Sequence, residues 1–330
     1  MTTIFSTHAM HPDVEARLRA TATLRIASAP TPEAILAEGV DADIIVVAAP
    51  IPPQFFVAAT RLRAAVRHGT GLDLIPVEAA TEAGVLVANA PGGNAASVAE
   101  HVVMSALLLA RQFRSVDHSL RHQGWAAGRA LCDENHDISG RRLGILGFGN
   151  IGRAVQKIAL GFGMQLAATT HRPETLPSDV IAMDIDALCA WSDILVLCCP
   201  LTDATRGLIS AARIGMMKPK TVLINVARGP VVDTEALIKA LAGRHIAGAA
   251  LDVFETQPLP ADSPLWLLDN VILTPHAASL TKDAMLRVGT MVADEIARIL
   301  DGELPMNLCN PAVAQAWRAR RFDGAELLNS

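Results

Sequence analysis

The first ninety residues alternate between short apolar runs and segments whose apolar residues recur every three or four positions. Apolar runs bounded by polar residues are typical of buried strands, and the wider spacing is typical of one helix face. Strands that alternate with helices pair in parallel and are covered on both faces. We expect strands at residues 23–28, 43–49, 62–67 and 85–88, and helices at 11–19, 32–37, 53–59 and 76–83.

The alternation resumes beyond residue 94, which predicts a second domain. Pro91-Gly92-Gly93-Asn94 breaks the first pattern, and Ser97 with Glu100 has the capping-box spacing of one long helix to about residue 121. A last helix, over residues 282–300, would return the chain to the first domain. We expect one domain of residues 1–97 and 283–330, and another of residues 98–282. Strands of the second domain are expected at residues 142–146, 164–169, 193–198, 221–225, 246–251 and 271–274.

The most specific motif is a glycine loop near the middle of the chain. The strand expected at residues 142–146 runs directly into Gly147-Phe148-Gly149-Asn150-Ile151-Gly152, and helix-forming residues follow it. A strand, a G-x-G-x-x-G turn and a helix form the dinucleotide-binding fingerprint, in which the helix N-terminus holds the pyrophosphate. The second domain is therefore predicted to be a doubly wound α/β sheet that binds a dinucleotide.

Composition excludes several classes of protein. The chain is 51% hydrophobic, but its longest nearly apolar stretch, residues 102–110, is too short for a membrane span, and residues 1–5 lack a signal-peptide pattern. A net charge of −5 without a long basic run argues against nucleic acid. The five cysteines include no C-x-x-C pair, so Cys198 and Cys199 are interpreted as buried thiols. We expect a cytoplasmic protein without membrane contact or metal.

Three polar residues follow the last three expected strands in turn. Ligands bind at the carboxyl ends of the strands in an open α/β sheet, and Arg228, Asp252 and His276 all belong to that edge. Arginine offers a planar, permanently charged fork for a carboxylate, and imidazole can exchange a proton near neutral pH. Their position downstream of a dinucleotide loop predicts an active site.

Several separate motifs occur in order along the chain: Gly69-Thr70-Gly71-Leu72-Asp73, Asn94-Ala95-Ala96-Ser97-Val98-Ala99-Glu100, the glycine loop, Asn225-Val226-Ala227-Arg228-Gly229, Leu251-Asp252-Val253-Phe254 and Pro275-His276. With these motifs the chain resembles the D-isomer-specific 2-hydroxyacid dehydrogenases, which include glyoxylate/hydroxypyruvate reductases and phosphoglycerate dehydrogenase. The resemblance implies a split flavodoxin-like substrate domain, a central Rossmann domain for NAD or NADP, and a homodimer through the Rossmann domain.

The resemblance also implies a role for each site residue. His276 would be the general acid, Arg228 would polarise the carbonyl and hold the carboxylate, and backbone N–H groups at Thr70 and Gly71 would hold the rest of the carboxylate. Asp252 would meet the nicotinamide carboxamide. The residues implied for the cofactor are Gly147, Gly149, Asn150, Ile151, Gly152, Cys199, Pro200, Val226, Ala227, Arg228, Asp252, His276 and Ser279.

Gln257 departs from the family pattern, in which most members have a glutamate that pairs with the histidine. A carboxylate raises the pKa of an adjacent imidazole, whereas a neutral amide can orient the ring but adds no charge. We therefore expect Gln257 to orient His276 and reduction to be favoured at lower pH, unless Glu255 replaces the missing carboxylate. Formate dehydrogenases of the family also have glutamine there, which leaves oxidation of a small anion as an alternative.

The residues that follow the strand at 164–169 bear on the choice of cofactor. An NAD enzyme places an acidic residue about 20 positions beyond the glycine loop to bind the ribose hydroxyls. Here Thr170, His171 and Arg172 occupy that region, and Arg172 can pair with a 2′-phosphate. We expect NADPH to be preferred over NADH; the simpler alternative is that His171 and Arg172 are solvated loop residues.

The first domain bears on the substrate. Phosphoglycerate dehydrogenases have an arginine where this chain has Val47-Ala48-Ala49-Pro50, so we expect a small unphosphorylated 2-oxo acid, glyoxylate or hydroxypyruvate first. His68 either contacts the substrate or packs inside the domain.

Two further interpretations concern partners. Met104 and Trp125 are interpreted as core residues rather than dimer contacts. A non-catalytic NAD(H)-sensing protein, like the corepressors that share this fold, is the alternative from a different functional class. Retention of Arg228 and His276 favours the enzyme over the sensor.

Overall fold

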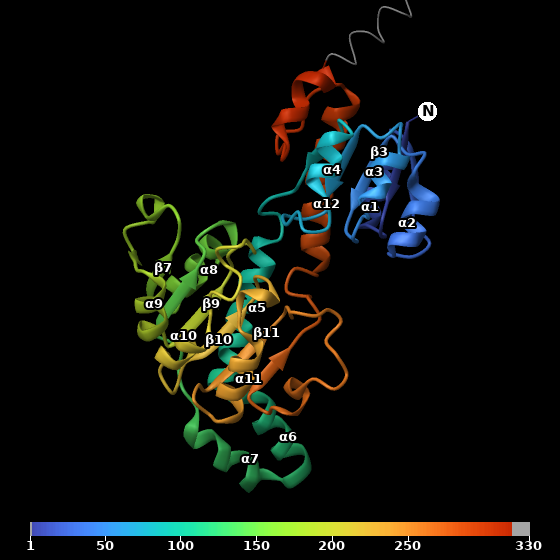
Figure 1. The fold of residues 1–330 in the computed structure, drawn as a ribbon. Coiled ribbons are helices and arrows are strands. Elements are labelled where there is room, and N and C mark those ends of the chain that lie inside the picture. Colours follow the sequence, from blue (N-terminus) through green and yellow to red (C-terminus); the bar gives the residue numbers. More distant parts are fainter. Residues whose placement is uncertain (1, 319–330) are drawn as a thin grey trace, which may run out of the picture. The chain divides into compact units, whose positions relative to one another are not determined.

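The computed structural model describes residues 2–318 and divides the chain into two compact units, each with its own sheet (Figure 1). The first unit is Met1–Asn94 with Leu280–Ser330, and the second is Ala95–Ser279. The boundaries predicted from the sequence were residues 97 and 283. Both sheets are entirely parallel, so the predicted α/β class is confirmed.

The first unit contains a five-stranded sheet in the order β2-β1-β3-β4-β5. Side chains alternate between the two faces of each strand, and in β3 both faces are apolar. Ile44 and Val46 join the core under α1 and α12, while Ile45 and Val47 join the core under α2 and α3. The elements are β1 (Thr3–Ser6), α1 (Pro12–Arg19), β2 (Thr23–Ile26), α2 (Pro32–Gly39), β3 (Ile44–Val47), α3 (Gln54–Ala58), β4 (Ala64–Arg67), α4 (Val77–Glu82), β5 (Leu86–Ala88), α12 (Lys282–Leu300) and the 3₁₀ turn η5 (Pro311–Val313).

The segment after α12 is tied back to this unit by two buried polar side chains. Glu295 on α12 accepts hydrogen bonds from the backbone N–H groups of Met306 (2.8 Å) and Asn307 (3.0 Å). Asn310 accepts from the N–H of Val87 in β5 (2.8 Å) and donates to the carbonyl of Val85 (2.9 Å). A buried carboxylate is stable only when it is well paired, so Glu295 holds the segment to α12, while Asn310 holds it to β5.

The second unit contains a seven-stranded sheet in the order β12-β11-β10-β9-β6-β7-β8. The apolar faces of α5 and α8 cover one side, and those of α9, α10 and α11 cover the other. The elements are α5 (Ala95–Ala110), α6 (Phe113–Gln123), α7 (Trp125–Leu131), η1 (Cys132–Glu134), β6 (Arg142–Leu146), α8 (Asn150–Gly161), β7 (Gln165–Thr169), η2 (Pro173–Thr175), β8 (Val180–Ala182), α9 (Ile185–Trp191), β9 (Ile194–Leu197), α10 (Ala211–Met216), β10 (Val222–Asn225), η3 (Gly229–Val231), α11 (Thr234–Ala242), β11 (Gly248–Leu251), η4 (Pro264–Leu267) and β12 (Val271–Leu273).

The single helix predicted from Ser97 to about residue 121 is wrong. The helix is interrupted at Gln112, which has a left-handed φ of 45°, and a new helix, α6, begins at Phe113. The carbonyl of Ala110 at the end of α5 accepts a hydrogen bond from the N–H of His136 (2.8 Å), so a returning loop replaces the next helical turn. No glycine or proline marks this break, and for that reason the periodicity did not reveal it.

The interpretation of Met104 and Trp125 as core residues is also wrong. Trp125 is 75% exposed and Met104 44% exposed. None of the residues of α6 is buried, because this helix packs against α7 rather than against the sheet. The region therefore presents apolar side chains outward.

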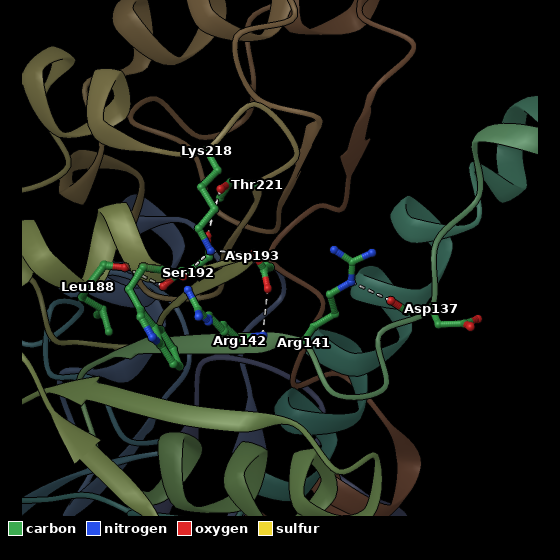
Figure 2. A network of polar contacts seen from close by, with 9 residues as sticks. Asp137, Arg141, Arg142, Leu188, Ser192, Asp193, Lys218 and Thr221 are labelled. Atoms are coloured by element: carbon green, nitrogen blue, oxygen red, sulfur yellow. Dashed lines mark hydrogen bonds and ion pairs between the residues drawn. The ribbon is translucent and has the colours of Figure 1, made fainter.

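A polar network at the amino ends of β6, β9 and β10 fixes the register of the sheet (Figure 2). Asp193 accepts from the N–H of Arg142 (3.0 Å) and from Nζ of Lys218 (2.7 Å), and the hydroxyl of Thr221 donates to the carbonyl of Ser192 (3.0 Å). Burial opposes ionisation of Asp193, but the hydrogen bonds from Lys218 and Arg142 outweigh it and lower the pKa of this carboxyl. This network lies at the end of the strands away from the glycine loop.

Two further features concern the helices and the cysteines. None of the helices described in residues 2–318 is long and apolar enough to cross a membrane. All five cysteines are free; burial raises the pKa of Cys198, and it raises the pKa of Cys199 to about 11, so these thiols are protonated and unreactive at neutral pH.

Candidate active site

The glycine loop between β6 and α8 has the geometry that a dinucleotide requires. Gly147 has φ +91°, and a Cβ there would lie 2.7 Å from Cα of Cys199. A Cβ on Gly152 would lie 2.7 Å from the carbonyl oxygen of Gly147, whereas one on Gly149 would meet nothing within 4 Å. Two glycines are thus required by packing, and the third leaves its backbone open for a ligand.

The loop lies where the strand order reverses, between β6 and β9. Ligands of doubly wound sheets bind at this switch point. The thiol of Cys198 contacts the carbonyl of Gly147 (2.9 Å), so the residues after β9 wall the loop from one side. At the start of α8, Gly149 provides no side-chain cap, so Asn150 and Ile151 begin a helix whose first N–H groups suit a phosphate. The residues present therefore fit a dinucleotide.

Arg228 is held by a turn at the carboxyl end of β10. The buried amide of Asn225 accepts from the N–H of Ala227 (3.0 Å) and donates to the carbonyl of Arg228 (3.1 Å). Arg228 is half-buried, and its Nη1 donates to the carbonyl of Ala227 (2.7 Å). The next position, 229, requires glycine, because a Cβ there would lie 1.9 Å from the backbone of Phe254. The turn therefore packs directly on the segment that carries Gln257.

Gln257 contacts the imidazole of His276. Its Nε2 donates to the carbonyl of Phe254 (3.4 Å), which turns Oε1 towards Nδ1 of His276 at 3.2 Å. An amide oxygen can only accept, so Nδ1 carries the proton and Nε2 of the neutral ring is the basic nitrogen. His276 is exposed, and Nε2 is therefore the nitrogen at which this ring takes up and releases a proton.

Asp252 is almost fully buried and contacts the residues that follow His276. Its carboxylate accepts from the N–H groups of Ala277 (2.7 Å) and Ala278 (3.0 Å) and from the hydroxyl of Thr274 (2.6 Å). His276 has φ +55°, a left-handed conformation that costs of order 1–3 kcal/mol for a residue with a side chain. The three donors to Asp252 surround this strained residue, so the carboxylate holds the loop.

On the first unit, the loop of Thr70 and Gly71 follows β4 and is fixed by Arg67. The guanidinium donates to the carbonyls of Gly71 (2.9 Å), Val47 (2.8 Å) and His68 (2.6 Å). The side-chain amide of Asn89 donates to the carbonyl of Thr70 (2.8 Å). These hydrogen bonds are all accepted by backbone carbonyl groups. They fix the backbone of the loop, as expected of an anion-binding turn.

His68, in the same loop, packs against His8, which follows β1. The two rings meet edge to face with centroids 4.7 Å apart, and His68 is 8% exposed. Burial, with Arg67 adding to it, lowers the pKa of His8 to about 4, and burial with the neighbouring His8 lowers the pKa of His68 to about 3. His68 is thus a packed, neutral histidine in this structure.

The region predicted to choose the cofactor follows β7. The hydroxyl of Thr170 accepts from the N–H of Arg172 (3.3 Å), and Arg172 directly precedes the 3₁₀ turn η2. His171 and Arg172 are both exposed. Pro200 is exposed beyond β9, whereas Val226 and Ala227 are buried beyond β10 and Ser279 is the last residue of the second unit.

Four residues with hydrogen bonds in these loops were given no role from the sequence: Arg67, His101, Asn225 and Thr274. Asn225 carried a signal, since it is a polar residue at the end of an apolar strand. The contact of His101 with Thr274 joins segments far apart in the chain, which a single sequence does not show.

The fold and the site together define a nicotinamide-dinucleotide oxidoreductase with two α/β units. The family model for the D-isomer specific 2-hydroxyacid dehydrogenase, NAD binding domain, matches residues 103–278. Glyoxylate reductase of Korarchaeum cryptofilum is 38% identical over 83% of this chain and 84% of its own length. D-3-phosphoglycerate dehydrogenase of Methanocaldococcus jannaschii is 37% identical over 94% of this chain, which spans only 60% of that relative. The chain belongs to the D-isomer specific 2-hydroxyacid dehydrogenase family.

Solved structures agree with this assignment. The TT0316 protein from Thermus thermophilus has a TM-score of 0.85 and 31% identity, covering 93% of this chain and 100% of its own. The NADPH-dependent glyoxylate/hydroxypyruvate reductase from Sinorhizobium meliloti has a TM-score of 0.83 and 26% identity, covering 94% and 99%. The NAD-dependent formate dehydrogenase from Staphylococcus aureus has a TM-score of 0.80 and 26% identity, covering 92% and 96%. The second unit is accordingly a Rossmann domain for a nicotinamide dinucleotide, and the protein is a 2-hydroxyacid dehydrogenase.

Proposed function

We propose that this protein reduces a small unphosphorylated 2-oxo acid, glyoxylate or hydroxypyruvate, to the D-2-hydroxy acid, with NADPH preferred over NADH. The observation that carries the proposal is the His276–Gln257 pair, since it leaves Nε2 as the nitrogen that exchanges a proton. The similarity to glyoxylate reductases supports the same substrate class. Thr70 and Gly71 are proposed to hold the substrate carboxylate together with Arg228.

The chemistry divides among the residues of the site. A bound nicotinamide dinucleotide supplies the hydride. Arg228 pairs with the substrate carboxylate through its planar fork and polarises the carbonyl. Protonated His276 gives its Nε2 proton to the carbonyl oxygen as that oxygen gains charge, while Gln257 keeps Nδ1–H in place. Asp252 holds the loop on which His276 lies.

The preference for NADPH is proposed from the residues after β7. Thr170 occupies the position where NAD enzymes of this fold place a carboxylate, and Arg172 is exposed beside it. A 2′-phosphate would find a cation there and no like charge at position 170. The similarity to an NADPH-dependent reductase is consistent with this choice.

An unphosphorylated substrate is proposed from the residues after β3. Relatives include D-3-phosphoglycerate dehydrogenases, but Ala48 and Ala49 stand where an arginine would bind a phosphate. Arg67 lies in the next strand, and its guanidinium donates to three backbone carbonyl groups, which fixes the loop of Thr70 and Gly71. Small apolar side chains at this edge suit a substrate with a short substituent.

The deciding experiment is the initial rate of NADPH and NADH oxidation with glyoxylate, hydroxypyruvate, pyruvate and phosphohydroxypyruvate. We expect glyoxylate or hydroxypyruvate to give the highest kcat/KM, and NADPH to exceed NADH. Higher efficiency with phosphohydroxypyruvate would refute the substrate class, and equal or higher efficiency with NADH would refute the cofactor preference. Tight cofactor binding without any turnover would favour the NAD(H)-sensing alternative.

One specific observation favours a second candidate, oxidation of formate. Gln257 provides a neutral partner for His276. Oxidation of formate transfers a hydride from formate to the cofactor and needs no proton donor for the substrate. The similarity to a formate dehydrogenase is of the same order as that to the reductase. Reduction of NAD or NADP by formate, in the absence of 2-oxo acid turnover, would establish this alternative.

We also propose that the protein is a homodimer through the second unit and acts in the cytoplasm. Phe113 and Leu120 on α6 and Trp125 on α7 are exposed apolar residues in one region. Phe113 lines a groove of about 1060 Å³ formed between α5, α6 and the amino ends of β9, β10 and β12. A group of exposed aromatic and apolar side chains is typical of a subunit interface. Free cysteines are consistent with a reducing compartment.

A further inference from the structure

The loop that carries His276 needs support, because its backbone is in an unfavourable conformation. His276 has φ +55°, and Ala277 and Ala278 follow it with their N–H groups directed at Asp252. The N–H of His276 itself donates to the carbonyl of Asp252 (2.8 Å). A side chain in left-handed backbone persists only where its surroundings determine the conformation. Asp252 is the centre of that support.

A second layer of hydrogen bonds orients Asp252. The hydroxyl of Thr274 donates to Oδ1 of Asp252 (2.6 Å), and Nε2 of His101 lies 3.5 Å from the same hydroxyl oxygen. Since the proton of Thr274 is used on Asp252, the hydroxyl oxygen can only accept from Nε2–H of His101. Burial lowers the pKa of His101 although Asp252 opposes this, so the ring is neutral near neutral pH and carries the single proton that this bond needs.

The three residues come from separate elements of the second unit. His101 lies on α5, Asp252 follows β11 and Thr274 follows β12. The contacts run from His101 to Thr274, from Thr274 to Asp252, and from Asp252 to the loop at residues 276–278. A hydrogen bond to a carboxylate is roughly twice as strong as one between neutral groups, and supporting contacts of this kind hold catalytic side chains in place.

We propose that His101 and Thr274 are positioning residues for the reaction: their hydrogen bonds fix Asp252, and Asp252 holds His276 in its left-handed loop. The inference rests on the proposed role of His276 as proton donor. The hydrogen bonds of His101 and Thr274 lead to Asp252, so their effect on the imidazole is transmitted through the carboxylate.

The test compares Thr274→Val with a matched variant, Thr221→Val. Both changes remove one hydroxyl from a threonine next to a strand end and keep its shape. Thr221 lies at the amino end of β10, where its hydroxyl donates to the carbonyl of Ser192 (Figure 2). His276 follows β12 at the opposite, carboxyl end of the parallel strands. Hydrogen exchange of the segment 272–280 is measured together with kcat, KM and the pH profile for hydroxypyruvate reduction.

We expect Thr274→Val to speed exchange at residues 276–278 and to lower kcat roughly tenfold or more, within the range attributed to a positioned general acid, with a smaller change in KM. Thr274→Ser, which restores the hydroxyl, recovers most of kcat, and His101→Phe gives a smaller loss in the same direction. Thr221→Val changes neither quantity more than about twofold.

Exchange at residues 276–278 that is the same in Thr274→Val as in the parent would overturn the proposal, as would equal losses of kcat in the two valine variants. Hydrogen exchange does not depend on turnover. A parent that reduces no 2-oxo acid but shows the expected exchange pattern would therefore refute the proposed function while leaving the role of Thr274 in the loop intact.

Discussion

Gln257 presents an amide oxygen to Nδ1 of His276, where a carboxylate would add a negative charge. Gln257→Glu is expected to raise the pKa of His276 and to extend reduction to higher pH, because a nearby anion stabilises the imidazolium. The pH dependence of kcat/KM for reduction checks this, with the ratio of the rates at pH 8 and pH 6 rising several-fold. Gln257→Met is the control: it removes the hydrogen bond without adding charge, so kcat falls while the profile keeps its position. Identical profiles in the parent and the glutamate variant would contradict this account of Gln257.

The residues of the site differ in how far the sequence revealed them. Arg228, Asp252 and His276 could be predicted because each follows a recognisable strand at one edge of a parallel sheet. The contact of Gln257 with His276 followed from the resemblance and is present in the structure. The roles of Thr274 and His101 could not be predicted, because their contacts join residues 173 positions apart. Left-handed φ at His276 likewise depends on Asp252 and has no local signal such as glycine.

At the scale of elements, the strands were predicted better than the helix ends. The continuous apolar run Ile44–Val47 was predicted as a strand, whereas β1 and β8 were missed. Ile181 in β8 is exposed at the edge of the sheet, so the usual apolar run is weak there. The break between α5 and α6 depends on the bond from His136 to Ala110, a contact that periodicity cannot show.

The segment after α12 is predicted to depend on Glu295. Glu295→Leu removes the acceptor of two backbone N–H groups and of the Asn307 amide, and we expect a loss of about 3 kcal/mol in the free energy of unfolding. Urea unfolding measures it. Glu303→Leu is the control, since its ion pair with Arg298 is at the surface and is worth less than about 1 kcal/mol. Equal losses in the two variants would show that the buried carboxylate does not hold the segment.

The pair of buried histidines makes the first unit sensitive to acid. The unfolded chain protonates these rings near pH 6.5, whereas the lowered pKa values of His8 and His68 in the folded unit are about 4 and about 3. Between these values the unfolded state binds more protons, so stability is full above pH 6.5 and falls as the pH is lowered towards 3. Each unit of pKa difference corresponds to about 1.4 kcal/mol. A His8→Phe/His68→Phe double variant should lose less stability than the parent between pH 7 and pH 4.5 in urea unfolding; equal losses would contradict the prediction.

At the scale of the whole molecule, the exposed apolar residues of α6 and α7 predict self-association. Trp125→Asp should convert a dimer into a monomer, because it places a charge at an exposed aromatic residue of the proposed interface. Light scattering after size exclusion gives the mass. Trp266→Asp is the matched control, since Trp266 is also exposed but lies on η4 and bonds the carbonyl of Pro260. A monomeric parent, or a Trp125→Asp variant that stays dimeric, would contradict the proposed interface.

The chain combines a Rossmann unit, whose glycine loop and sheet edge hold the residues proposed for cofactor binding and proton transfer, with a smaller unit in which Arg67 fixes the loop proposed to bind the substrate carboxylate. The most direct test is chiral analysis of the product formed from hydroxypyruvate and NADPH. We predict D-glycerate in an amount equal to the NADPH consumed. Formation of the L-enantiomer, or loss of NADPH without glycerate, would contradict the central claim that His276 and Arg228 carry out reduction of a 2-oxo acid to the D-2-hydroxy acid.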